Sequence, residues 1–343
     1  MACTGGTPPS LGAAARSEPS APRGETLVVS THTAIGPVAA SQGHLVWESV
    51  PLESAASVPT LRDRNLTTGK TRTLAAGVDP LFGVAATSRF VFYARSSGRS
   101  TSLIRVSHEG TGTRVLTGSL ATPIASRDGV VAWGETSGGT ERVVASNGSR
   151  HWLVATMARC TPEACYRLDT VTVAAGGVIF TRDAIGVPTS QVVRRSFGSH
   201  TAAVLDVRGD PQPNLVPSSS GALYYVLSRG WYRWDFGAAR PRTVRFANHP
   251  VKELVLHERR RWFWLVRHGC TVRLESTDAG DGTALAPPRR VVRLGAEYGP
   301  TCQQLGDLVW AGGRVIASWA IASEAAESAH TDVGLRGVVV ATR

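Results

Sequence analysis

The chain repeats one short pattern seven times along its 343 residues. Each copy opens with a strand-like segment, passes through small or polar turn residues, and ends in a β-branched and aromatic run. Six of the seven copies begin with a dipeptide whose second residue is proline. The copies start at Gly36, Asp79, Thr122, Leu168, Gln212, His249 and Gly299. Their spacing of about 45 residues indicates one structural unit per copy.

A period of this length with two strands at its head is typical of a propeller blade, a sheet of four antiparallel strands. The rest of each unit supplies two further alternating segments with a Gly-containing turn, as in PTLRDRNLTTG and KTRTLAAG after Trp47. No window shows an amphipathic helix of useful length. We therefore expect an all-β fold, a seven-bladed β-propeller, with a six-bladed ring as the alternative.

The two ends of the chain complement each other. The last unit is one strand short, because only GLRGVVVATR follows RVIASWAI, and ETLVVSTH from Glu25 is a spare strand ahead of the first unit. A ring that closes leaves no open blade at its end. We predict that residues 25–32 pair with the last blade. Residues 25–343 would then form a single domain, preceded by a disordered Pro/Gly/Ser/Ala-rich tether over residues 1–24.

The composition is strongly basic, with a formal net charge of +11. Only Lys70 and Lys252 are lysines, and such arginine usage is typical of a GC-rich genome, for example an actinobacterium. We therefore discount the charge as evidence for nucleic-acid binding. Arginines at positions 194–195, 259–261 and 289–290 could instead contact anionic envelope polymers. No hydrophobic run is long enough to span a membrane.

The five cysteines divide into two pairs and one outlier. Two pairs suit an oxidised protein, and the nearest partners along the chain are Cys160 with Cys165 and Cys270 with Cys302. The other two pairings of these four remain open, as do reduced thiols in a cytoplasmic protein. A zinc site is disfavoured because no His or Cys stands at ligand spacing beside them. We therefore predict two disulfides.

The outlier, Cys3, follows Ala2 and precedes the flexible segment TGGTPPSLGAAARSEPSAPRG. This arrangement resembles the acceptor cysteine of a bacterial lipoprotein, although the basic and apolar parts of such a signal are absent. The resemblance implies a secreted protein, or one anchored by a lipid on Cys3 to the outer face of the cell membrane. Membrane association would then depend on that lipid alone.

The segment SRDGVVAW, residues 126–133, carries a tight Asp128-Gly129 turn. It resembles the SPDG hairpin of TolB-type propeller repeats, with Arg127 where that family has proline. The resemblance implies a domain outside the cytoplasm that binds proteins or peptides. TolB-type propellers mostly have six blades, so the seventh unit indicates a relative rather than a member.

The loops that enter the innermost strands of a propeller converge on one face, where binding and catalytic groups gather. Two or three carboxylates there could act as acid and base in glycoside cleavage. The alternative is turn capping, since Asp-Pro is a typical turn start. The candidates for this face are His32, Asp79, Asp169, Arg208, Asp210, Asn214, His249 and Glu297.

Motifs of known enzymes are absent from the sequence. SRDGVVAW fails the sialidase Asp box, because Val130 stands where that motif has glycine, and there is no Gly-x-Ser-x-Gly elbow. Phosphate-binding and dinucleotide-binding loops are also missing. The nine histidines are scattered. We therefore predict no catalytic residue, no cofactor and no metal.

Two aromatic runs call for opposite interpretations. Trp262 and Trp264 share one strand face and Phe263 takes the other, as packing between blades requires. Trp231, Tyr232 and Trp234 follow a Gly turn and are predicted to be exposed. The loop over residues 155–167, which the first predicted disulfide would stiffen, is a candidate recognition loop.

These observations predict a monomeric, extracytoplasmic binding or scaffold module for a protein, a peptide or an anionic envelope polymer. The alternative is a carbohydrate-active hydrolase or lyase that uses carboxylates of the loop face. An enzyme of that kind needs two carboxylates from different blades across an open cleft, about 5–10 Å apart. A binding module needs no such pair.

Overall fold

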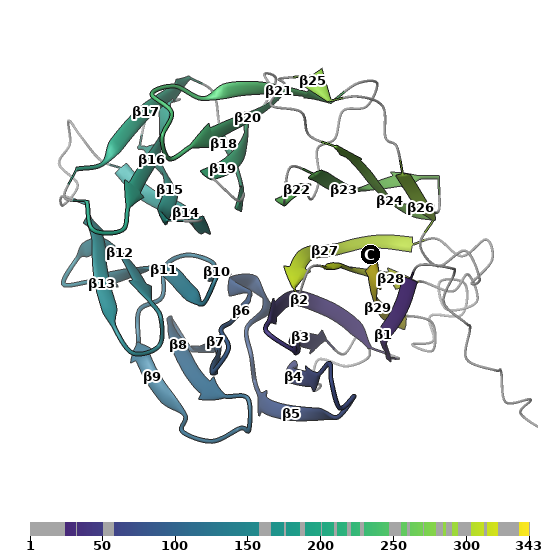
Figure 1. Cartoon of the computed structure of the whole chain (residues 1–343). Helices are drawn as coiled ribbons and strands as arrows, with labels where there is room; N and C mark the ends of the chain where they lie inside the picture. Colours follow the sequence, from purple (N-terminus) through teal and green to yellow (C-terminus); the bar gives the residue numbers. More distant parts are fainter. Residues whose placement is uncertain are drawn as a thin grey trace, which may run out of the picture.

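Figure 1 shows the computed structural model of the chain, in which strands follow one another around a central axis. The structure describes residues 25–31, 33–50, 58–157, 166–174, 176–185, 189–199, 201–208, 211–217, 221–226, 230–246, 255–258, 261–269, 271–278, 284–285, 290–293, 303–311, 314–321 and 336–342. These residues form seven sheets, numbered here along the chain. Their only helical element is one 3-10 turn, η1 (Pro80–Phe82). No helix in this part of the chain has the length and apolar character needed to cross a bilayer.

The first four sheets each contain four consecutive antiparallel strands. Sheet 1 contains β2 (Ala34–Ser41), β3 (His44–Val50), β4 (Thr60–Asn65) and β5 (Thr71–Ala76). Sheet 2 contains β6 (Val84–Ala86), β7 (Phe90–Ser97), β8 (Ser100–Ser107) and β9 (Arg114–Thr117). Sheet 3 contains β10 (Ala125–Arg127), β11 (Val130–Ser137), β12 (Thr140–Ser146) and β13 (His151–Thr156). Sheet 4 contains β14 (Tyr166–Ala174), β15 (Gly177–Ala184), β16 (Thr189–Ser196) and β17 (Ala203–Arg208).

The next two sheets vary this plan. Sheet 5 contains β18 (Pro211–Pro217), β19 (Gly221–Val226), β20 (Gly230–Asp235) and β21 (Arg242–Phe246), and β25 (Ala284–Leu285) pairs parallel to β21 at its edge. Sheet 6 contains β22 (Val255–Glu258), β23 (Arg261–His268), β24 (Thr271–Asp278) and β26 (Arg290–Arg293). The parallel addition of β25 had no counterpart in the sequence analysis.

Sheet 7 combines the two ends of the described chain. Its strand order is β1 (Glu25–Thr31), β29 (Arg336–Thr342), β28 (Arg314–Ile321) and β27 (Gln303–Ala311). Strand β1 pairs antiparallel with β29, from Glu25 opposite Thr342 to Thr31 opposite Gly337. This pairing joins residues that are more than 300 positions apart in the sequence.

The first strands of sheets 1 to 6 and β27 of sheet 7 are called here the inner strands, because they lie nearest the centre of the ring (Figure 1). Each inner strand contacts the inner strand of the next sheet, and β27 contacts β2. The loops that lead into the inner strands lie on what we call the top face, and the turns that leave them lie on the bottom face. The sheets therefore follow a propeller arrangement, as the sequence predicted.

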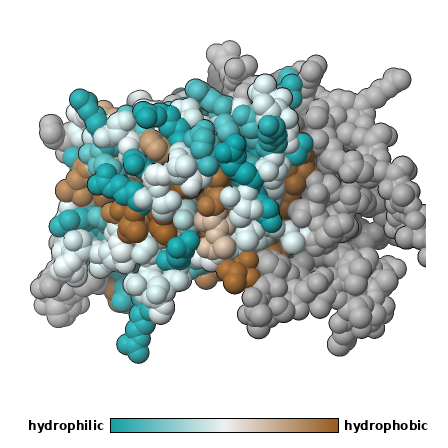
Figure 2. All heavy atoms as spheres, turned by 90° about the horizontal axis from the view of Figure 1, so that it is seen from below, coloured by the Kyte–Doolittle hydropathy of each residue, from teal (hydrophilic) through white to brown (hydrophobic). Residues whose placement is uncertain are grey.

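Apolar side chains fill the seams between adjacent sheets. One cluster joins Val46 of sheet 1 to Tyr93 of sheet 2, and another joins Ala132 of sheet 3 to Phe180 of sheet 4. Sheets 1 to 4 are therefore covered on both faces, which explains why their strands read as near-continuous hydrophobic runs. The outer edge is mixed: seen from the side of β5 and β9, hydrophobic residues form separate groups between hydrophilic ones (Figure 2).

The Asp128-Gly129 dipeptide forms the turn predicted from SRDG. Arg127 pairs with Val130, and the two residues between them have φ angles of 49° and 79°. A two-residue hairpin with positive φ at both positions matches the twist of the flanking strands. Asp128 is the non-glycine residue that takes this conformation among those described.

The two aromatic runs are both buried, which confirms one prediction and corrects the other. Trp262, Phe263 and Trp264 are at most 8% exposed, as packing between sheets requires. Trp231 and Trp234 are each 2% exposed, although they were predicted to be exposed, and Tyr232 is half-buried. The two tryptophans point to opposite faces of β20, and neighbouring sheets cover both faces. A position just after a turn does not show how deep the strand lies.

Candidate functional site

Bulges on the inner strands form the framework of the top face. The pairing register shifts between Ile35 and Val38 of β2, between Leu168 and Thr170 of β14, within β18 and within β27. A bulge bends its strand and turns a side chain out of the regular alternation. The predicted site residues Asp169 and Asn214 lie within two of these bulges. These inner-strand bulges are therefore the places where the top face can present groups toward the axis.

Asp79 begins η1, in the connection from sheet 1 to sheet 2. Its Oδ1 accepts a hydrogen bond from the Leu81 backbone N–H at 3.1 Å, and Pro80 occupies the first turn of the helix. The hydroxyl of Ser96, at the end of β7, donates to its Oδ2. The turn-capping interpretation of Asp79 is confirmed, because both carboxylate oxygens already have local donors.

The same cap exposes an apolar side chain on the top face. Leu81 has an exposed fraction of 81%, the highest of the large exposed hydrophobic side chains among the described residues. Val58 and Ile185, which are also exposed at 51% and 52%, follow strands that end on the same face. An apolar side chain held in water by a capped turn can bury its surface only against a partner.

Asp307 occupies the bulge of β27 and reaches across the seam between sheets 7 and 1. Its Oδ2 accepts a hydrogen bond from the Val38 backbone N–H at 2.7 Å, next to the bulge of β2. Its own backbone N–H donates to the Ser318 hydroxyl at 2.7 Å. Burial raises the pKa of Asp307, and the hydrogen bond from Val38 opposes that rise. This carboxylate ties two inner strands together.

Glu48 is the most unusual carboxyl group on this side of the molecule. It lies on β3 with an exposed fraction of 0%, and neither carboxylate oxygen has a hydrogen-bond partner among the described residues. It packs against the β2 bulge, where a Cβ built on Gly36 would come within 3.4 Å of the Glu48 Cβ. Burial, followed by the charges of Asp79 and Asp307, raises its pKa to about 7. An ionised Glu48 has no compensating partner here.

Two carboxyl groups from other elements thus act on Glu48 near the top face. Glu48, Asp79 and Asp307 belong to sheet 1, to the following connection and to sheet 7. A carboxyl group with a pKa near 7 has the acidity of a general acid. Glu48 is sealed from solvent, however, and the other two already accept hydrogen bonds. The open cleft that glycoside cleavage requires is therefore not formed by this trio.

The other predicted residues of the top face fall into two groups. Asp169 accepts a hydrogen bond from the Thr181 hydroxyl of β15 at 3.0 Å. Arg208 and Asn214 lie on β17 and β18, but their side chains are outside the described part. The remaining candidates also lie outside the described residues, together with the five cysteines, so their predicted roles stay predictions: His32, Asp210, His249, Glu297, Cys3, Cys160, Cys165, Cys270 and Cys302.

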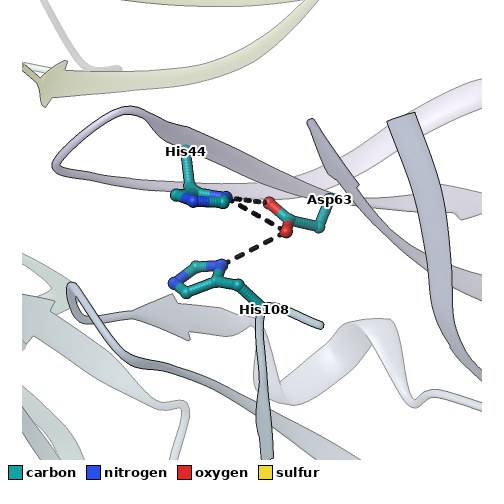
Figure 3. Close-up of side chains that lie close together, drawn as sticks. All are labelled: His44, Asp63 and His108. Carbon is teal, nitrogen blue, oxygen red and sulfur yellow. Dashed lines mark hydrogen bonds and ion pairs between the residues drawn. The ribbon is translucent and has the colours of Figure 1, made fainter. Parts of the chain in front are cut away.

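A second cluster lies toward the bottom face, between sheets 1 and 2. Figure 3 shows its three side chains close together. His44 begins β3, Asp63 lies on β4, and His108 follows β8 of the next sheet. The His44 Nδ1 is 3.0 Å and 3.1 Å from the two Asp63 carboxylate oxygens, and the His108 Nδ1 is 3.3 Å from Oδ2. The imidazole centroids are 3.9 Å apart. One ligand atom from each residue lies within 4.8 Å of the others, so the three could hold a metal ion.

Of the residues in the two clusters, only Asp79 was predicted from the sequence. Glu48 and Asp307 are 259 positions apart, and His44 and His108 are 64 positions apart. Each pair meets only because neighbouring sheets stack side by side. The one local signal was the charged Glu48 inside the apolar run LVWESV, where a buried strand normally has no charge.

Comparison with known proteins supports the fold and leaves the function open. No protein-family model and no curated protein sequence matches the chain. A solved chain from a study of two prolyl endopeptidases aligns with a TM-score of 0.59 and 15% identity. The alignment covers 87% of this chain and 46% of that one, so this chain spans less than half the length of that peptidase.

Two further solved structures align with the chain. The β-propeller domain of the Trilobed protease from Pyrococcus furiosus, which has an open velcro topology, aligns with a TM-score of 0.57 and 7% identity. That alignment covers 84% of this chain and 91% of that domain. TolB from Acinetobacter baumannii aligns with a TM-score of 0.42 and 13% identity, over 73% of this chain and 65% of TolB. The two alignments with a TM-score above 0.5, at identities of 15% and 7%, show a β-propeller fold.

Proposed function

We propose that the chain is a non-catalytic binding module whose top face docks a protein or peptide through the loop around Leu81. The seven sheets serve as the blades of one ring, which β1 and β29 close, over a single domain of residues 25–343. In this proposal the module works outside the cytoplasm, with residues 1–24 as a tether, a lipid on Cys3 and two disulfides.

The observation that carries the proposal is the contrast between Leu81 and Glu48. The apolar side chain stands 81% exposed on a capped turn, whereas the carboxyl group with the acidity for catalysis is completely buried. A hydrolase would need the reverse arrangement, with its acid open to substrate. A binding face needs apolar contact residues held rigidly by their own loops.

The chemistry of the exposed side chains favours a protein or peptide over an envelope polymer. Val58, Leu81 and Ile185 are aliphatic, and aliphatic side chains gain free energy by burial against other apolar groups. An anionic polysaccharide offers few such groups. Burial of Leu81 on binding would contribute about 2 kcal/mol.

A pull-down from an envelope extract of the source organism tests the proposal. The baits are the unaltered chain, Leu81→Asp, and Leu153→Asp as the matched control, since Leu153 is 59% exposed on the outer strand β13. We expect the unaltered chain and the control to retain the same protein, and Leu81→Asp to lose it. Retention by all three baits, or by none, would contradict docking at the top face.

A further inference from the structure

In the bottom-face cluster of His44, Asp63 and His108, the hydrogen-bond acceptors outnumber the donors by one. The His108 Nε2 lies 2.8 Å from the Thr87 carbonyl oxygen, so this nitrogen must carry a proton and donate it. In neutral His108 the Nδ1 then has a lone pair, and it faces the Asp63 Oδ2 at 3.3 Å. Two acceptors face each other here, and both residues are at most 3% exposed. A cation has to lie between them.

The cation is either a proton, held by His108 or by Asp63, or a metal ion shared by the cluster. A proton on His108 would make a buried imidazolium whose ring stacks on His44 at 3.9 Å. The buried Asp63 would compensate the positive charge of that imidazolium. Glu109, which is exposed, is the second acid that acts on His108. A metal ion satisfies the two imidazole nitrogens and the carboxylate together, because each then donates a lone pair to the ion.

We propose that His44, Asp63 and His108 form a binding site for a divalent transition-metal ion, with zinc as the ion that suits these donors best. Two imidazoles and one carboxylate are a zinc donor set that leaves a fourth position for water. Ligand atoms about 2.0–2.2 Å from a tetrahedral zinc lie about 3.3 Å from one another. The nitrogen–oxygen distances of 3.0–3.3 Å in this cluster match that spacing.

The surroundings of the cluster meet two further requirements of a metal site. A metal-bound histidine normally donates its other ring N–H to a carbonyl or carboxylate, which fixes its tautomer. His108 does so to Thr87, whose position in its turn is fixed by a 2.8 Å hydrogen bond from its backbone N–H to the Phe90 carbonyl oxygen. The His44 side chain is 20% exposed, which opens a path from solvent to the buried ligands.

The site lies in the seam between two sheets, and its occupation would link them. His44 and Asp63 belong to sheet 1, and His108 follows β8 of sheet 2. An ion that binds the folded chain and not the unfolded one raises the free energy of unfolding. The proposal concerns the bottom face, so it stands or falls independently of docking at the top face.

Titration of the chelator-treated full chain with Zn²⁺ tests the site. The chain carries no polyhistidine tag and its free thiols are alkylated, because both would bind zinc. We expect one zinc per chain by calorimetry and a melting temperature that rises with zinc concentration. Cobalt(II) should give visible bands of nitrogen and oxygen ligation without a thiolate band. Absence of saturable binding near one equivalent would overturn the proposal and leave His108 as an imidazolium.

Variants assign the zinc to these residues. His44→Ala removes the most exposed ligand, and Asp63→Asn replaces the buried carboxylate. We expect each to weaken zinc binding by more than about tenfold. His151→Ala is the matched control, since His151 is an exposed histidine on β13 outside the cluster. Zinc affinity that is unchanged in His44→Ala would also overturn the proposal. The cobalt spectrum of the unaltered chain decides the ligand type even where Asp63→Asn does not fold.

Discussion

Glu48 makes stability depend on pH in a direction opposite to that of an ordinary ion-paired carboxylate. Its pKa is 4.5 in the unfolded chain and about 7 in the folded one. Below pH 4.5 both states hold the proton. Between the two values the folded state holds more protons, so the free energy of unfolding falls as pH rises. Above pH 7 the folded state carries a penalty of about 3 kcal/mol.

The substitution Glu48→Gln removes this penalty and keeps the shape of the side chain. Burying the glutamine amide costs the same free energy at every pH. The quantity to compare is therefore the change in the free energy of unfolding between two pH values. We predict that, from pH 4.5 to pH 8, the free energy of unfolding of the variant rises by about 3 kcal/mol relative to that of the unaltered chain. Urea unfolding at both pH values measures this gain. Glu135→Gln, which alters a carboxylate that accepts from the Trp133 indole N–H, is the control without such a gain.

Individual site residues were predictable only where their function is local. Asp79 caps the turn that Pro80 begins, and the structure confirms this local prediction. Glu48 depends on a bulge in β2 and on Asp307, and His44 depends on a turn of the next sheet. A linear pattern does not show which side chains of two neighbouring sheets will meet. The polar clusters of the seams therefore lay beyond sequence reasoning.

At the scale of elements, close approach between neighbouring sheets makes specific demands on side-chain size. Gly134 lies on β11, and a Cβ added there would meet Leu168 of β14 at 2.2 Å and Thr122 at 2.6 Å. The backbone N–H of Gly134 also donates to the Thr122 hydroxyl at 2.7 Å. A methyl group at this position would force the buried side chains of Leu168 and Thr122 out of their places in the seam.

We predict that Gly134→Ala destabilises the protein by about 1–3 kcal/mol. Gly118→Ala is the matched control, since Gly118 has open space around its added Cβ and no positive φ. Thermal unfolding of the two variants and the unaltered chain measures the difference. An equal melting temperature for Gly134→Ala and the control would contradict the tight seam between sheets 3 and 4.

Strand positions were predictable from the repeat, whereas depth and edge pairing were not. Alternation identified the packing of Trp262 and Phe263, because β23 is a central strand with two covered faces. The prediction for Trp231 was wrong, because it inferred exposure from the preceding Gly turn. The parallel addition of β25 joins segments about 40 residues apart and follows from no local pattern.

At the scale of the whole molecule, the two ends of the described chain meet in sheet 7. Val29 of β1 and Ile316 of β28 pack with Leu45 and Trp47 of sheet 1, so β1 contributes to the seam between sheets 7 and 1 as well as to its own sheet. The similar propeller from the Trilobed protease has an open velcro topology. Here β1 pairs with β29 along the whole strand. We propose that this pairing holds the ring closed.

The repeat made the propeller fold predictable because each sheet needs its neighbours on both faces. The chain supplies seven similar units and a spare strand, and sheet 7 pairs that strand with the last one. The bottom-face zinc site and the top-face docking loop both require the sheets to be held in register around one axis. Loss of closure would affect both.

Thermal unfolding of two shortened chains tests ring closure most directly. One chain starts at residue 25 and keeps β1, and the other starts at residue 32 and lacks it. We predict that the first melts in a single transition at the temperature of the full chain. The second should melt more than about 5 °C lower, because it loses the β29 pairing and the burial of Val29. Identical cooperative transitions for both chains would contradict a ring closed by β1.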